Sequence, residues 1–177
     1  MGKVNPNEKE EGNPGRLRRL GYGAAFFLVF AIAAAALGLD AQQLHKYGNT
    51  NQNYASLEYK NALGLCLFSC IFTFLWLIAH WQVNMGLSIF FTLVGAVFWG
   101  TCAGIFYHST PFRAFTCDNP VDTFPTKWQP YVGECTRVVS LQGLCWAEWA
   151  LLCLMLVMSI IHKIEIRPRP EASYYGP

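Results

Sequence analysis

Residues 85–107 read MGLSIFFTLVGAVFWGTCAGIFY, a stretch without a single charged side chain. A helix rises about 1.5 Å per residue, so about 20 mostly apolar residues cross the roughly 30 Å of hydrocarbon in a bilayer. In hydrocarbon every backbone N–H and C=O group needs a partner within the protein, and a helix supplies these partners by itself. The stretch therefore predicts a helix that crosses a membrane.

Three further blocks meet the same test. Residues 20–39 and 62–79 are uncharged, and residues 138–161 contain one charged side chain. None of the blocks shows the alternation of polar and apolar residues that is typical of a membrane barrel. Only residues 80–84 separate the second block from the third, which makes these two helices antiparallel neighbours. We therefore predict an all-α, polytopic membrane protein with four transmembrane helices in an antiparallel bundle.

The composition agrees with a membrane protein. Charged residues make up 14% of the chain, whereas a typical soluble domain carries about 25%. The formal net charge of +2 is too small a bias to indicate a nucleic-acid partner. We expect a tail at residues 1–19, a four-helix membrane domain at residues 20–161 and a second tail at residues 162–177.

Basic residues indicate how the chain is oriented. Four spans place both tails on one side of the membrane, and cytoplasmic segments carry an excess of Lys and Arg, above all next to the first span. The tails hold Lys3, Lys9, Arg16, Arg18, Arg19, Lys163, Arg167 and Arg169, and the two long loops hold Lys46, Lys60, Arg113, Lys127 and Arg137. This bias predicts that both tails are cytoplasmic.

The seven cysteines fall into two groups. Cys117 and Cys135 both lie in the long third loop, where an oxidising lumen would join them in a disulfide; two free thiols are the alternative. The other five lie within spans, and Cys66 and Cys70 share one helix face. These two offer too few ligands for a metal, so we expect the intramembrane cysteines to be packing residues and predict no metal site.

Glu148 is the one ionisable side chain well inside a predicted span. A carboxylate at membrane depth is costly, and none of the spans offers it a Lys or Arg partner. We expect a neutral carboxyl group that donates a hydrogen bond to Gln142 or to a hydroxyl group of another span. A structural contact between helices, a contact with a partner or a lipid, and a role in transport all stay open.

Small residues recur four positions apart in three of the spans. Such pairs let helix backbones approach closely. We expect them to pack helices together within the bundle, with self-association of the protein as the alternative. The pairs are Gly100 and Gly104, Ala34 and Gly38, and Gly143 and Ala147.

The chain resembles the MARVEL-domain family, and its fungal members in particular. The resemblance rests on the four spans, the tight middle hairpin and the cysteine pair of the third loop. It also rests on VFWGTCA at residues 97–103 and on YVGEC at residues 131–135, which leads into a fourth span that contains Trp146 and Trp149. It covers about residues 16–162. It implies a non-enzymatic protein that organises membrane microdomains, often sterol-rich ones, or takes part in vesicle trafficking.

These observations lead to three hypotheses about function. The first is a membrane-organising protein of the plasma membrane or of secretory and endosomal membranes. Its partners would be membrane lipids, including sterols, and other membrane proteins or further copies of itself. The second is an accessory subunit of a larger membrane complex, and the third is a small transporter or a lipid-modifying enzyme. Neither C-x-x-C nor G-x-S-x-G occurs, so we predict no catalytic residues and no cofactor.

Overall fold

The protein is a bundle of four long helices. The computed structural model describes residues 14–166, and within this range the side chains of residues 20–80 and 82–161. The long helices are α1 (Pro14–Tyr47), α2 (Leu57–Ala79), α3 (Met85–Ser109) and α4 (Cys135–Ile166), and residues 14–166 contain no strand. The predicted all-α class is therefore confirmed. Four short 3-10 helices lie between them: η1 (Asn51–Asn53), η2 (His80–Gln82), η3 (Val121–Thr123) and η4 (Gln129–Glu134).

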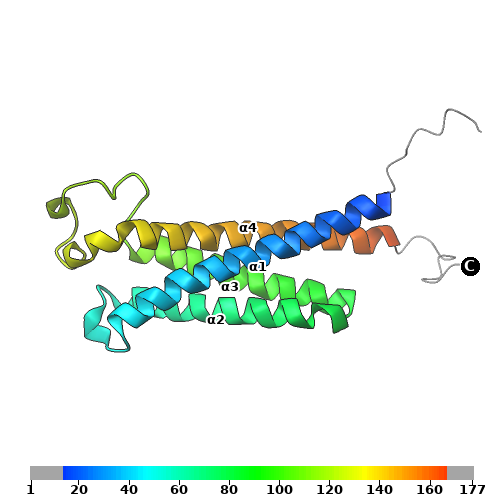
Figure 1. Ribbon diagram of the computed structural model, residues 1–177, viewed down its shortest axis with the longest axis horizontal. Coiled ribbons are helices and arrows are strands. Elements are labelled where there is room, and N and C mark those ends of the chain that lie inside the picture. Colours follow the sequence, from blue (N-terminus) through cyan, green and yellow to red (C-terminus); the bar gives the residue numbers. More distant parts are fainter. Residues whose placement is uncertain (1–13, 167–177) are drawn as a thin grey trace, which may run out of the picture.

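The four long helices run lengthwise beside one another (Figure 1). Each helix packs against its neighbour in the chain, and α4 packs against α1 to close the ring. We call the end that carries residues 48–56 and 110–134 the loop end. The opposite end, where η2 joins α2 to α3, is the hairpin end. Helices α2 and α3 are neighbours in the bundle and run antiparallel, so this prediction is confirmed.

Helix α1 is longer than the sequence predicts. The predicted first span ends at residue 39, whereas α1 continues to Tyr47. Gly48 ends it with a φ of 66°, and its N–H donates to the carbonyl of Leu44 over 2.9 Å, which is a common way to cap a helix C-terminus. Residues 40–47 are mostly polar but include no Gly or Pro, so nothing stops the helix earlier.

The other boundaries lie closer to prediction. Helix α2 begins at Leu57 because the Ser56 side chain caps it, accepting from the Tyr59 N–H over 3.1 Å. Helix α3 ends at Ser109, two residues before Pro111, since Pro disfavours helical geometry in the residue before it. Helix α4 begins at Cys135, three residues before the predicted span.

The surface of the bundle shows that this is an integral membrane protein. All four long helices are long and apolar enough to cross a bilayer. Large apolar side chains stand exposed along every helix, whereas soluble monomers rarely expose apolar patches beyond a few hundred Å². Examples are Phe27, Phe30, Phe68, Leu75, Ile78, Phe90, Val97, Leu154 and Val157.

The core lies along the bundle axis and contains both apolar and polar groups. Trp99 and Phe106 of α3 are fully buried, as are Leu63 of α2 and Leu141 of α4. The Trp99 indole N–H donates to the Thr73 hydroxyl over 3.0 Å, which joins α3 to α2. Buried Trp residues usually find such a partner, and this one fixes the orientation of the two helices.

Candidate functional site

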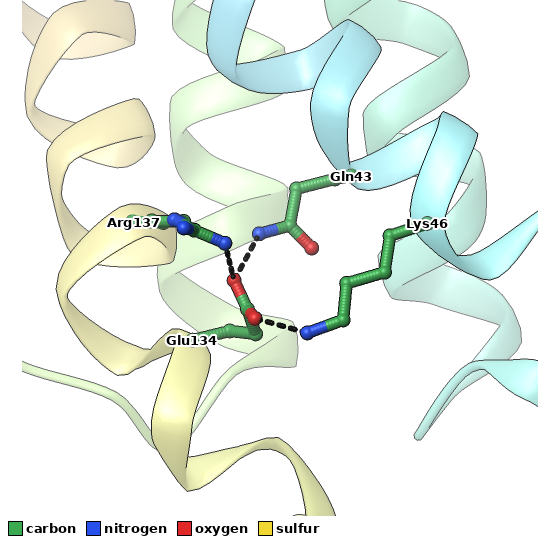
Figure 2. A network of polar contacts seen from close by, with 4 residues as sticks. All are labelled: Gln43, Lys46, Glu134 and Arg137. Carbon is green, nitrogen blue, oxygen red and sulfur yellow. Dashed lines mark hydrogen bonds and ion pairs between the residues drawn. The ribbon is translucent and has the colours of Figure 1, made fainter.

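A carboxylate at the loop end holds the first and last helices together. Glu134 is the last residue of η4, immediately before α4, and is only 6% exposed. Figure 2 shows it between three donors: Gln43 at 3.2 Å and Arg137 at 2.8 Å donate to one oxygen, and Lys46 pairs with the other. Gln43 and Lys46 come from the final turns of α1. The network therefore joins the end of α1 to the start of α4.

Aromatic rings and the disulfide form a cap over the loop end. The Trp128 ring packs against Tyr59 of α2 at 5.6 Å and against Phe112 at 5.3 Å. The Tyr131 hydroxyl donates to the carbonyl of Asn53 over 2.8 Å, which ties the long third loop to the first one. Cys117 and Cys135 are bonded, as predicted. The two loops thus form one ordered layer.

Arg113 fixes the beginning of the third loop. Its guanidinium donates to the carbonyls of Thr110, Phe112 and Tyr107 over 2.7 to 2.9 Å. It also lies over the Tyr107 ring, 4.1 Å from the ring centre. These contacts satisfy carbonyl groups that the end of α3 would otherwise leave unpaired.

Glu148 lies in the core, as its position in the span suggests, but it makes no polar contact there. Its side chain is fully buried, and neither carboxyl oxygen has a hydrogen-bond partner within residues 14–166. The expected hydrogen bond to Gln142 or to a hydroxyl group is therefore not made. The hydroxyl groups of Ser69, Thr73 and Thr92 instead donate to backbone carbonyls of their own helices.

A second buried carboxyl group was missed from the sequence. The first predicted span ends at residue 39, just before Asp40, but α1 continues past Asp40 and this side chain is fully buried. Its oxygens also lack partners in the part of the chain that the structure describes. The available signal was the absence of any helix-stopping residue between Asp40 and Gly48.

The two buried carboxyl groups lie far apart along the bundle. Glu148 on α4 is fourteen residues after Glu134, the residue immediately before α4, which is about 21 Å at 1.5 Å per residue. Asp40 is three residues before Gln43, the residue that contacts Glu134, which is about 5 Å on α1. The separation along the axis is therefore about 15 Å, too far for a direct proton transfer between the two groups.

The small-residue pairs play two different roles. Gly100 packs within the bundle, because a Cβ atom there would lie 2.7 Å from the Trp149 indole. At Gly38, Gly104 and Gly143 such a Cβ has no atom of another described helix within 4 Å, and Ala34 and Ala147 are exposed. Of the six residues expected to pack helices inside the bundle, Gly100 alone is in close contact with another helix, and the pairs on α1 and α4 lie at exposed positions.

A cavity of about 350 Å³ opens between the four helices at the hairpin end. Its lining combines aromatic rings and methionine side chains with hydroxyl groups. Burial lowers the pKa of His80, whose ring lies 4.2 Å from that of Phe26. The lining consists of Tyr22, Phe26, Trp76, His80, Val83, Met85, Ser88, Thr92, Met155 and Ser159.

No family model, curated protein or solved structure matches this chain.

Proposed function

We propose that the protein is a non-enzymatic membrane organiser that acts in microdomain organisation or vesicle trafficking. The observation that carries the proposal is the hairpin-end cavity. Its volume of about 350 Å³ lies within the range of small-molecule sites, about 300–1,000 Å³. Apolar side chains with a few hydroxyl groups suit a membrane lipid with a small polar group, such as a sterol. A lipid held there would couple the protein to membranes rich in that lipid.

The proposal includes an orientation and a location. The excess of basic residues in the tails favours cytoplasmic tails, with the loop end in the lumen or outside the cell. The disulfide between Cys117 and Cys135 supports this, since disulfides persist in oxidising compartments. The plasma membrane and the secretory and endosomal membranes meet both conditions.

Lipid crosslinking in vesicles tests the proposal. The full chain is reconstituted with a photoactivatable sterol, and crosslinked peptides are identified by mass spectrometry. We expect crosslinks on peptides that contain Phe26 or Met155, and fewer of them in Ser88→Phe, which fills the cavity. Ser140→Phe, at an exposed position on α4, is the matched control. Equal crosslinking in both variants, or crosslinks spread evenly over the helices, would count against lipid binding in the cavity.

The outward small residues favour an accessory subunit as the second candidate. Ala34 and Gly38 on α1, and Gly143 and Ala147 on α4, leave room for another helix to approach closely. Purification in mild detergent followed by mass spectrometry distinguishes the two. One partner at constant stoichiometry would favour the subunit, and its absence would favour the membrane organiser.

The pair of buried carboxyl groups, Asp40 and Glu148, is the one specific observation that favours a transporter or a lipid-modifying enzyme. Buried ionisable groups in membrane spans commonly mark ion pathways, and among the described side chains two buried carboxyl groups have no hydrogen-bond partner. Their separation of about 15 Å along the axis weakens this candidate. A proton-flux assay in vesicles with an internal pH dye tests it. Flux that Asp40→Asn and Glu148→Gln abolish would replace the membrane-organising proposal with transport.

A further inference from the structure

Three thiol groups from three helices meet in the centre of the bundle. They belong to Cys66 of α2, Cys102 of α3 and Cys145 of α4, and all three residues are fully buried. The Cys145 sulfur lies 3.9 Å from that of Cys66 and 4.0 Å from that of Cys102. All three sulfur atoms lie within 4.8 Å of one another. Cys66 and Cys70 offered too few ligands on the sequence alone, and the fold adds ligands from two more helices.

The sulfur triangle already has the dimensions of a metal–thiolate site. Two sides measure 3.9 and 4.0 Å and the third is no longer than 4.8 Å. The point equidistant from the three sulfur atoms is therefore about 2.3 to 2.5 Å from each, close to the metal–sulfur distance of about 2.3 Å in thiolate sites. A metal ion could bind there without any helix moving.

We propose that Cys66, Cys102 and Cys145 bind one Cu(I) ion. Thiolates are soft ligands and select soft metals such as Cu(I). Cu(I) is stable with three ligands in a plane and requires no water molecule, which suits a site that is closed to solvent. Zn²⁺ normally takes four ligands in a tetrahedron. The buried Cys70, one turn from Cys66, lies outside the group of three sulfur atoms and does not complete one.

Binding of Cu(I) leaves the site with a negative charge, and the neighbouring Glu148 can stabilise that charge with a hydrogen bond. The metal replaces thiol protons, which are released. A Cu(I) ion with two thiolates and one thiol carries one net negative charge. Glu148 lies one turn after Cys145 on the same face of α4. Its unpartnered carboxyl group, when protonated, can donate a hydrogen bond to a thiolate sulfur.

Metal analysis of the purified full chain tests the site. The protein is expressed in copper-supplemented cells, purified anaerobically in mild detergent without a disulfide reductant, and analysed for copper and zinc by mass spectrometry. We expect about one copper per chain, and X-ray absorption that shows Cu(I) with sulfur neighbours at about 2.3 Å. Protein purified without copper is titrated with Cu(I) in acetonitrile, and should reach the same content.

Variants locate the metal. Cys66→Ala, Cys102→Ala and Cys145→Ala should each lower the copper content roughly tenfold or more. Cys70→Ala and Cys153→Ala are the matched controls and should keep it, since neither residue belongs to the triangle. Elution volume in size-exclusion chromatography checks that each variant is folded. Three results would overturn the proposal: wild type that takes up no copper in the titration, copper retained by a folded Cys145→Ala, or zinc bound in place of copper.

Discussion

The indole ring of Trp149 on α4 fills the space that Gly100 leaves open on α3. A Cβ atom at position 100 would lie 2.7 Å from one indole carbon and 2.9 Å from the indole nitrogen. The third and fourth helices can therefore approach closely here only because residue 100 has no side chain.

Gly100→Ala should accordingly destabilise the bundle. The added methyl group forces the indole out of its position, and overpacking of this kind costs about 1 to 3 kcal/mol. Gly104→Ala, one turn along α3, meets no described atom within 4 Å and should change stability by less than about 1 kcal/mol. Melting curves followed by fluorescence-detected size-exclusion chromatography compare the two. Equal melting temperatures would mean that the indole moves aside at no cost.

Glu134 should contribute more to stability than its exposed partner Lys46. Glu134→Ala leaves the amide of Gln43, which is 2% exposed, without its acceptor, and an unsatisfied buried group costs about 1 to 3 kcal/mol. Lys46→Met removes a side chain that is half exposed, so a smaller loss is expected. Glu58→Gln, at an exposed position on α2, serves as the control for loss of a carboxylate. A larger loss in Lys46→Met than in Glu134→Ala would contradict the assignment of Glu134 as the centre of the network.

Removing the unpartnered carboxyl group of Glu148 should stabilise the metal-free protein. Glu148→Met replaces a buried group that lacks a hydrogen bond by an apolar side chain of similar size, and we expect a gain of about 1 to 3 kcal/mol. Thr73→Val is the opposite case, because it removes the acceptor of the Trp99 N–H and should lower stability by about 1 to 2 kcal/mol. Thermal melting of both variants in the same detergent measures this. A folded but less stable Glu148→Met would show that the carboxyl group has a stabilising partner.

His80 should make stability depend on pH below neutrality. Burial lowers the pKa of His80 in the folded protein, while the unfolded chain keeps the ordinary value of about 6.5. The unfolded chain then binds more protons as the pH falls through that value, so the folded state loses stability on acidification and keeps it above pH 7. The melting temperature of His80→Gln should fall less between pH 7.5 and 5.5 than that of wild type, on the order of a few degrees. His108→Gln, at an exposed position, is the control and should follow wild type.

The sequence predicts the four helices because, in hydrocarbon, an apolar block has few ways other than a helix to pair its backbone N–H and C=O groups. The middle hairpin was predictable because only residues 80–84 connect two spans. The disulfide was predictable because Cys117 and Cys135 are the two cysteines outside the predicted spans. Asp40 lies outside the predicted span because it is charged, whereas no helix-breaking residue occurs before Gly48 and the helix continues through it.

Contacts between distant residues were beyond the sequence. Glu134 precedes the fourth predicted span and meets Lys46 only when the ring of helices closes. Whether Gly38 or Gly143 lies on the inner or the outer face of the bundle depends on the rotation of each helix about its axis. A spacing of four residues does not determine that rotation. The sulfur triangle depends on the same rotations in three helices at once.

The polar network around Glu134 also constrains the order in which contacts form while the chain is synthesised. Gln43 and Lys46 leave the ribosome long before Glu134, since translation proceeds from the first helix to the last. The contacts of Gln43 and Lys46 with Glu134 can therefore form only after the first three helices have been synthesised. A nascent chain that stops before residue 134 lacks the carboxylate that joins the end of α1 to the start of α4.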